Sequence, residues 1–150
     1  MRFEGDREFP LPPAELFAKL RDARFMVQCI PDSTPQGEPT QDKAQCTVRP
    51  GFAFVRGTIE VTLEVAEAVA PTKLRLMLLS KGIGTSSDVE AIASFAAKDA
   101  GTHVHWTAEV KRLGGLLKAV PGGLIRGAAQ KIIDDLWNGV AAKLAAKSAG

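Results

Sequence analysis

The chain has 150 residues, its composition is 45% hydrophobic and 24% charged, and its formal net charge is +2. This composition fits one globular domain over residues 1–150 and argues against an intrinsically disordered chain. The near-neutral charge argues against a nucleic-acid-binding protein, and no apolar run approaches the roughly 20 residues of a membrane-spanning helix.

The N-terminal residues MRFEGDREF are charged and lack the apolar centre of a secretory signal, which predicts a cytoplasmic protein. The two cysteines, Cys29 and Cys46, are therefore expected to be reduced, because disulfides are rare in that compartment. A free cysteine often packs as a small apolar residue, so we expect both thiols to be buried.

The first predicted element is a strand over residues 2–9. Phe3, Gly5 and Phe9 share one face and the other face is charged, which is the period-two pattern of a half-buried strand. Arg7 falls on the apolar face. Three explanations are open: a bulge shifts the alternation, the side chain reaches solvent at the sheet edge, or Arg7 is a polar anchor at a cavity mouth.

Two short helices are predicted next. Pro12 and Pro13 fit the first turn of a helix, where a missing N–H costs no hydrogen bond. Asp22 can cap a second helix, which ends before Pro31. The residues that follow are polar and rich in turn formers, which predicts a loop with a short edge strand near residues 36–38.

Five further strands are predicted where apolar and polar residues alternate. They span residues 43–49, 54–68, 72–81, 85–98 and 102–112. Short turns join neighbouring strands, including a Pro-Gly turn at residues 50–51, so we expect the strands to pair antiparallel.

The last predicted element is a long helix over residues 120–146. Its apolar residues recur at helical spacing: Leu124, Ile125, Ala128, Ile132, Leu136 and Val140. Gly122, Gly123 and Gly127 near its start favour close backbone approach or movement at a cavity mouth. The element order predicts an α+β fold, in which a curved antiparallel sheet of six or seven strands wraps around this helix and two short helices follow the first strand.

No arrangement of residues in the sequence points to catalysis or metal binding. His103 and His105 share one face of a strand, but that face is polar and no cluster of carboxylates or cysteines accompanies them. No serine–histidine–aspartate order, phosphate-binding loop or CxxC pair stands out. We therefore expect no catalytic residues, no metal and no cofactor.

The apolar face of the sheet predicts a binding cavity instead. A long curved sheet closed by a helix rich in glycine and alanine leaves space that its side chains do not fill, although a tightly packed core is the alternative. The residues expected to line or gate this cavity are Arg7, Phe25, Met26, Val61, Leu63, Leu76, Leu78, Val89, Trp106, Leu124, Ala128, Ile132 and Leu136.

Several residues in the first part of the chain form a distinctive pattern, namely Phe3, Glu4, Gly5, Pro12, Pro13, Cys29, Ile30 and Pro31. This pattern resembles the CoxG family of carbon monoxide dehydrogenase subunits, within the START-like (SRPBCC) superfamily, and the resemblance extends over nearly the whole chain. Asp32 stands where the family pattern has glycine. The resemblance implies a helix-grip fold, a quinone-like or other lipid ligand, and a role in maturation or membrane attachment of a molybdenum-containing carbon monoxide dehydrogenase.

Together these features predict a non-catalytic protein that binds a hydrophobic small molecule or lipid and is accessory to such a molybdenum hydroxylase. One alternative is a cyclase or dehydratase-type enzyme, which needs Arg7, Glu90 or His105 to face the cavity. A second alternative is an adaptor that docks on a partner enzyme or on a membrane surface, peripheral to the inner membrane face. The basic residues available for docking are Lys111, Arg112, Lys118, Arg126 and Lys131.

Overall fold

The computed structural model describes residues 1–49, 57–82 and 84–149. The predicted turn at residues 50–51 and residues 54–56 of a predicted strand lie outside the described residues. The elements in chain order are β1 (Arg2–Phe9), α1 (Pro13–Leu20), α2 (Ala23–Gln28), β2 (Ser33–Gln36), β3 (Lys43–Val48), β4 (Ile59–Val69), β5 (Lys73–Gly82), β6 (Thr85–Lys98), β7 (Gly101–Gly115), η1 (Leu116–Ala119) and α3 (Gly122–Ala149).

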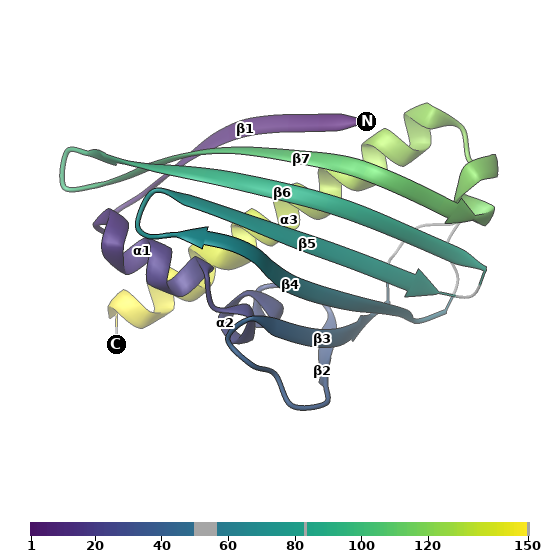
Figure 1. Ribbon diagram of the computed structural model, residues 1–150, viewed down its shortest axis with the longest axis horizontal. Helices are drawn as coiled ribbons and strands as arrows, with labels where there is room; N and C mark the ends of the chain where they lie inside the picture. The colour runs from purple at the N-terminus through teal and green to yellow at the C-terminus, as the bar shows by residue number, and fades with distance from the viewer. Residues whose placement is uncertain (50–56, 83, 150) are drawn as a thin grey trace.

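The strands form one antiparallel sheet in the order β1-β7-β6-β5-β4-β3-β2. Figure 1 shows α3 running diagonally across one face of this sheet, with α1 and α2 at the end where α3 finishes. The register shifts between Val65 and Glu67 in β4 and between Asp88 and Val89 in β6, and such bulges bend and twist strands. The predicted α+β helix-grip fold, with seven strands, is confirmed.

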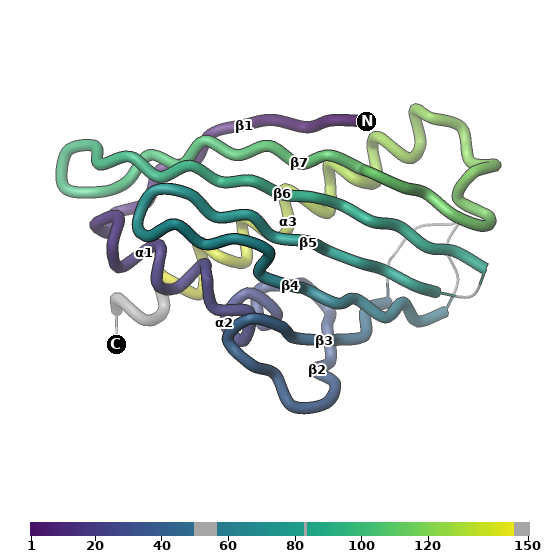
Figure 2. The backbone as a smooth tube through the Cα atoms, viewed as in Figure 1, coloured from purple at the N-terminus to yellow at the C-terminus, as the bar shows by residue number. Residues whose placement is uncertain are grey.

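The first strand lies at one edge of the sheet, beside the last one (Figure 2). Phe3 pairs with Ala108 and Phe9 with Thr102, and both phenylalanines are buried against the core, as their alternation predicts. The Cβ of a residue larger than glycine at position 5 would fall 2.7 Å from the Trp106 ring. Gly5 therefore makes room for that indole on the inner face of the sheet.

The two short helices follow the predicted signals. α1 begins at Pro13 and buries Leu16 and Leu20. The Asp22 carboxylate accepts a hydrogen bond of 2.9 Å from the backbone N–H of Arg24, which caps α2.

The short edge strand begins earlier than the predicted residues 36–38. Asp32 has φ 55°, a left-handed conformation that aspartate tolerates and glycine adopts without strain, and β2 starts directly after it. Gly37 has φ 66°, which takes the backbone out of the extended region and ends β2 at Gln36. The two positive-φ residues on either side therefore determine where the strand begins and ends.

Most of the core lies between the sheet and the two short helices, where the second half of α3 also packs. A smaller cluster contains Phe3, Trp106 and Ala108 and packs against Ile133 and Trp137 of α3. Cys29 and Cys46 are both buried and are not joined in a disulfide, as predicted.

The packed face of α3 matches the predicted one only in part. Ile125, Val140 and Leu144 are buried, whereas Leu124 and Ile132 are 56% and 52% exposed. The reason is that only one side of α3 packs against the sheet. The neighbouring side of the helix is covered only where α2 lies beside it. The sequence does not carry this information, because apolar residues occupy both sides.

Glycine allows close backbone approach at Gly139 rather than at the start of α3. A Cβ at Gly139 would collide with the backbone carbonyl of Cys29, at the end of α2. At Gly122, Gly123 and Gly127 a Cβ would meet no atom within 4 Å, so the predicted close approach there is wrong.

Candidate functional site

Among the described residues, one end of the inner sheet face is apolar but incompletely covered. Leu63 pairs with Leu78, and Leu78 pairs with Val89, so the three form a row across β4, β5 and β6. Leu63 is fully buried beneath the helices, whereas Leu78 and Val89 are half-buried. Val61, one step further along β4, is also half-buried.

One side of α3 also carries exposed apolar residues. Leu124, Ala128 and Ile132 recur every four residues and therefore share one side of the helix. Ala128 is half-buried, and the two larger residues are more than half exposed. We define the open apolar surface as these three residues together with Val61, Leu78 and Val89.

Two serines add a polar element to this end of the inner face. Ser80 follows Leu78 by two positions and Ser87 precedes Val89 by two, so both face inward. Their hydroxyls are hydrogen-bonded to each other, and both residues are half-buried. This pair was not predicted from the sequence, although both serines occupy inward positions that the alternation along each strand identifies.

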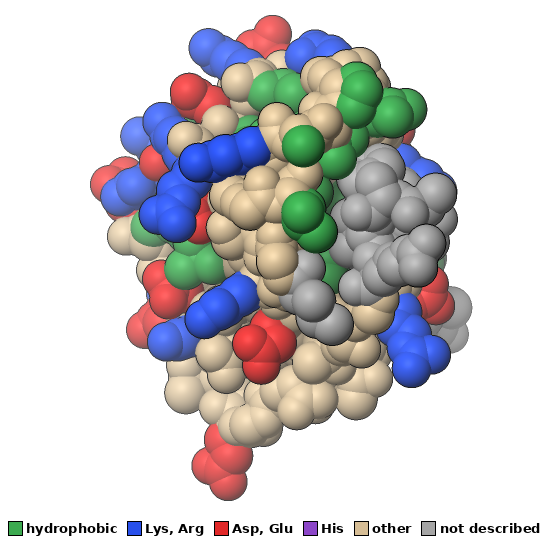
Figure 3. Space-filling model, turned by 90° about the vertical axis from the view of Figure 1, so that its right-hand side faces the viewer, with side chains coloured by type: hydrophobic (Ala, Val, Ile, Leu, Met, Phe, Trp, Pro, Cys, Tyr) green, Lys and Arg blue, Asp and Glu red, His purple; other side chains and the backbone are tan. Residues whose placement is uncertain are grey.

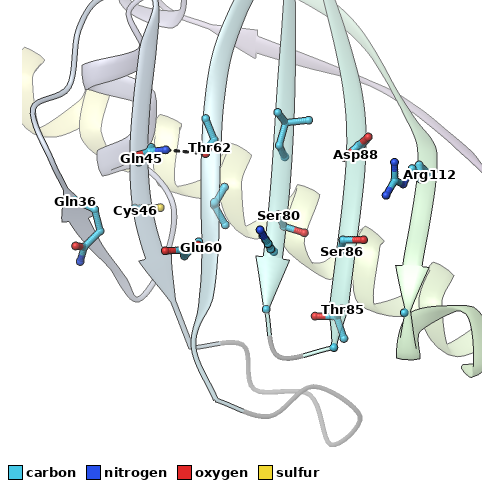
Figure 4. Close-up of a pocket in the computed structure, with 16 residues that line it drawn as sticks. Gln36, Gln45, Cys46, Glu60, Thr62, Ser80, Thr85, Ser86, Asp88 and Arg112 are labelled. Atoms are coloured by element: carbon cyan, nitrogen blue, oxygen red, sulfur yellow. Dashed lines mark hydrogen bonds between the residues drawn. The ribbon is translucent and has the colours of Figure 1, made fainter.

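A hollow of about 740 Å³ lies at the same end of the sheet and is lined by residues of β2 to β7. Its lining includes Val61 and Ser80, but other lining residues, such as Glu60, Thr62 and Asp88, alternate with the inward positions and face the outer side of the sheet. Figure 4 shows that most of the labelled residues around it are polar, and that Gln45 donates a hydrogen bond to Thr62. Asp88 of β6 and Arg112 of β7, which lie opposite each other in register, line its far side.

The remaining predicted lining residues lie deeper in the core or on its margin. Phe25 and Met26 of α2 are buried, and so are Leu76 and Trp106 on the sheet. Leu136 of α3 is half-buried and packs against the core. These side chains belong to the packed core and not to the open apolar surface.

Arg7 faces inward, as its position in β1 predicts, but it is not at the open apolar surface. Its guanidinium donates a hydrogen bond of 3.2 Å to the Asn138 side chain of α3. Asn138 follows Ile132 by six residues, which turns it about 120° away around the helix. Arg7 therefore binds the side of α3 next to β1.

The outer face of β1 and β7 carries a cluster of charged residues. His103 Nε2 and His105 Nδ1 each lie 2.9 Å from the same Asp6 carboxylate oxygen, and Glu4 lies 3.4 Å from His105. The hydrogen bond with Asp6 raises the pKa of His105, and the same bond lowers the pKa of Asp6. In the described part of the chain, no group of three or more His, Cys, Asp or Glu residues has the geometry of a metal site.

A second hollow, of about 480 Å³, lies where the end of α2 meets α3, and its lining includes Cys29, Ile30, Pro31 and Gly139. The Cys29 thiol donates to the Phe25 carbonyl at 3.4 Å within α2. The Cys-Ile-Pro motif therefore forms the contact between α2 and α3.

The sequence matches one family of known proteins over most of its length. This is the CoxG family, described as a subunit of carbon monoxide dehydrogenase, and its model matches residues 5–145. No protein among those of curated function matches the sequence.

Solved structures share the fold at low identity. A conserved protein from Geobacillus kaustophilus is 21% identical, with a TM-score of 0.82 over 97% of this chain and 95% of its own. Ms6760 from Mycobacterium smegmatis is 11% identical, with a TM-score of 0.66 over 97% and 92%. PFC0360w, an HSP90 activator from Plasmodium falciparum, is 18% identical, with a TM-score of 0.61 over 97% and 96%.

Proposed function

The chain belongs to the CoxG family of carbon monoxide dehydrogenase subunits, and from this premise we propose that it is an accessory protein that binds a largely apolar small molecule, such as a lipid or a quinone-like compound. The ligand would lie on the open apolar surface, between the inner sheet face and the exposed side of α3. The observations that carry this proposal are the exposure of Leu124 and Ile132 on α3 and the half-burial of Leu78 and Val89 on the sheet face that α3 crosses.

Exposed apolar side chains favour an apolar ligand for a thermodynamic reason. Burying a leucine or isoleucine side chain fully is worth about 1.5–3 kcal/mol. Two such side chains are more than half exposed here, within a single helix. A ligand that covers them recovers part of that free energy.

The Ser80–Ser87 pair supports a ligand with one polar group. The two hydroxyls satisfy each other in the free protein, and each retains further hydrogen-bonding capacity. Ligand sites are commonly apolar surfaces with a few well-placed polar groups. We therefore expect an apolar body with one hydroxyl or carbonyl group directed at these serines.

Ligand-induced stabilisation tests the proposal, because a ligand that binds only the native state raises the unfolding temperature. The probes are long-chain fatty alcohols, fatty acids and short-chain quinones in solution. Replacing Ala128 with Phe fills the open apolar surface and should abolish the shift. Ala141→Phe, at an exposed position of the same helix, is the matched control and should retain it. The proposal fails if none of these probes stabilises the protein, or if both variants respond equally.

Catalysis in the same site has less support. Glu90 lies 3.2 Å from Arg75, and it alternates with the inward residues of β6. His105 faces Asp6 on the outer face, and Arg7 contacts Asn138. None of the three polar residues that an enzyme would need lies at the open apolar surface, which favours a binding role over catalysis.

The biological partner follows from the family alone. We propose that the protein assists assembly or membrane attachment of a molybdenum hydroxylase of the carbon monoxide dehydrogenase type, on the cytoplasmic side of the membrane. No helix in the described ranges has the length and hydropathy needed to cross a bilayer. Co-purification of a tagged chain with such an enzyme from its native host tests this role, and recovery of the chain without the enzyme counts against it.

A further inference from the structure

The indole N–H of Trp106 is a buried donor that has no acceptor among the described residues. Trp106 is only 7% exposed, and an indole N–H can donate a hydrogen bond but cannot accept one. The other buried side-chain atom in this state, Nη1 of Arg21, belongs to a guanidinium that bonds Asp42 through Nη2 at 3.0 Å. A buried indole usually finds an acceptor, so the Trp106 N–H is an unused donor in the interior.

The unused donor lies over Gly5 of the edge strand β1. Gly5 is opposite Trp106 in register, and a Cβ at Gly5 would fall 2.7 Å from the ring and 3.1 Å from Nε1. The missing side chain of Gly5 therefore leaves the space in which the N–H lies. Phe3 belongs to the same cluster, and Ile133 and Trp137 of α3 pack against it. The N–H is therefore located between β1 and α3.

The side of α3 that faces β1 is polar. Gln130, Asp134 and Asn138 recur every four residues, so they share one side of the helix. Asn138 accepts the hydrogen bond of 3.2 Å from Arg7, which shows that this side faces β1. Asp134 follows Ile132 by two residues, a turn of about 200° around the helix. This polar side is therefore directed away from the open apolar surface.

Two arginines flank the unused donor. Arg7 lies two positions after Gly5 on the inner face of β1. Two positions before Gly5, the Arg126 guanidinium lies over Phe3, at 4.9 Å from the ring centre. Neither arginine forms an ion pair with a carboxylate of the described ranges. The carboxylate on the polar side of α3 is that of Asp134, which accepts a hydrogen bond of 3.0 Å from within the helix. Two positive charges therefore face one negative charge.

These positive charges can be reached from solvent. Arg126 is exposed and Arg7 is half-buried. Figure 3 looks onto the end of the molecule at which α3 begins, and it shows Lys and Arg side chains along the upper edge, at the level of β1 in Figure 1. An anion that approaches this edge therefore meets positive charge before it meets the buried donor.

A buried N–H donor flanked by two guanidinium groups matches a carboxylate. Carboxylate oxygens accept hydrogen bonds, and bonds to a charged acceptor are stronger than bonds between neutral groups. The side chains around the donor are apolar, namely Phe3, Ile133 and Trp137, which favours a carboxylate carried on an apolar chain. Inorganic phosphate would place charged oxygens against these side chains as well, which costs free energy.

We propose that the protein binds the carboxylate of an apolar organic acid at a β1–α3 site, which consists of Gly5, Arg7, Trp106, Arg126 and Asn138. One carboxylate oxygen accepts the hydrogen bond from the Trp106 N–H, and the two arginines balance the charge. Because the N–H is covered in the free protein, the carboxylate displaces a neighbouring side chain to reach it. The β1–α3 site is separate from the open apolar surface and does not rest on the proposed function.

Nuclear magnetic resonance of the full chain labelled with ¹⁵N tests this hydrogen bond directly. The chain has two tryptophans, so the spectrum contains two indole N–H signals, and Trp137→Phe assigns them. Octanoate should move the Trp106 signal downfield. Methyl octanoate has a similar chain without the charge, inorganic phosphate has the charge without the chain, and both should leave the signal nearly unchanged. A Trp106 signal that does not respond to octanoate below its micelle concentration would overturn the proposal.

Matched variants separate the contributions to octanoate affinity, which calorimetry measures. Trp106→Phe keeps an aromatic ring but removes the N–H, and it should weaken binding roughly tenfold or more, whereas Trp137→Phe should retain it. Arg7→Gln should also weaken binding, whereas Arg2→Gln, on the opposite face of the same strand, should not. Asp134→Asn should strengthen binding, because it removes the opposing charge. Equal affinity in Trp106→Phe and wild type would contradict the assignment, and the resonance measurement on the wild type decides the matter if Trp106→Phe does not fold.

The two proposals fail separately. Ala128→Phe fills the open apolar surface but leaves every residue of the β1–α3 site in place. It should keep the response of the Trp106 signal to octanoate while losing the thermal response to fatty alcohols and quinones. Trp106→Phe should show the reverse. Loss of the Trp106 response in a folded Ala128→Phe variant would place octanoate on the open apolar surface and overturn the β1–α3 site alone.

Discussion

The backbone carbonyl of Cys29 lies well within 3.0 Å of the position that a Cβ on Gly139 would occupy, so the end of α2 rests directly on the backbone of α3. The contact joins the Cys-Ile-Pro motif to the last helix. It also covers one end of the inner sheet face, whereas the described residues cover the other end only in part.

Gly139→Ala should therefore destabilise the protein. The new methyl group must push α2 away from α3, and such overpacking typically costs about 1–3 kcal/mol, which exceeds the gain of up to about 1 kcal/mol in helix propensity. Urea denaturation followed by circular dichroism measures the change. Gly127→Ala on the same helix, where the methyl group meets no atom within 4 Å, should instead stabilise by about 0.5–1 kcal/mol. Equal effects at the two positions would show that α2 does not rest on Gly139.

Leu63 and Leu78 are paired across β4 and β5 but should respond differently to truncation. Leu63→Ala removes a fully buried side chain and should cost about 2–5 kcal/mol of unfolding free energy. Leu78→Ala removes a half-buried side chain and should cost clearly less in the absence of ligand. Chemical denaturation of the two variants measures both values. Similar costs would mean that Leu78 is covered in solution.

The contact of Asp6 with His105 predicts a pH-dependent contribution to stability. The pKa of His105 is raised above 6.5 in the folded state, so its contribution is complete below pH 6.5 and is lost as the pH rises through the folded-state pKa. The pKa of Asp6 is lowered below 3.8, so its contribution is complete above pH 3.8 and is lost as the pH falls through its folded-state pKa. The pair should stabilise the fold most between these two pH values.

Asp6→Asn should therefore lower the unfolding temperature most between pH 4 and 6, with a smaller effect at pH 9. Thermal unfolding across this pH range checks the profile, and an NMR titration of His105 should show its pKa falling in the variant. Asp42→Asn is the control, because Asp42 pairs with Arg21, whose charge does not change in this range. A constant difference between wild type and Asp6→Asn at all pH values would exclude this coupling.

The Ser80–Ser87 pair should affect ligand choice more than stability. Replacing both serines with alanine removes both partners of one hydrogen bond, which is close to neutral for folding. A ligand hydroxyl or carbonyl group would lose about 1 kcal/mol, or roughly fivefold in affinity. Titration calorimetry measures how much affinity the double variant loses for a fatty alcohol and for the corresponding methyl ether, which has a lower hydrogen-bonding capacity. Equal losses for both ligands would place the polar group elsewhere.

Much of the fold follows from local sequence patterns. The alternation of Val61 and Leu63 with polar neighbours identifies a strand and its inward face, because the side-chain period of a strand is fixed at two. The packed side of α3 is harder to predict, because Leu124 and Ile125 are adjacent and equally apolar. Which of them is buried depends on which side of α3 meets the sheet, and only the assembled structure contains that information.

The candidate site, like the fold, can be predicted from the sequence only in part. The strand residues of the open apolar surface are predictable because each lies on an inward position. Their exposure is not, since it depends on the helices covering only one end of the sheet. The alternation places Arg7 on the correct face, but its partner Asn138 lies 131 positions away in the chain. The joint contact of Asp6 with His103 and His105 depends likewise on the register of β1 with β7.

The pairing of β1 with β7 has a consequence for synthesis of the chain. Phe3 pairs with Ala108, so β1 has no strand partner until about 100 further residues have been translated. At about 5–20 residues per second, this takes roughly 5–20 s. During that interval a strand with Phe3 and Phe9 on one face leaves the ribosome unpaired, and it is the segment of the nascent chain on which we expect a chaperone to act first.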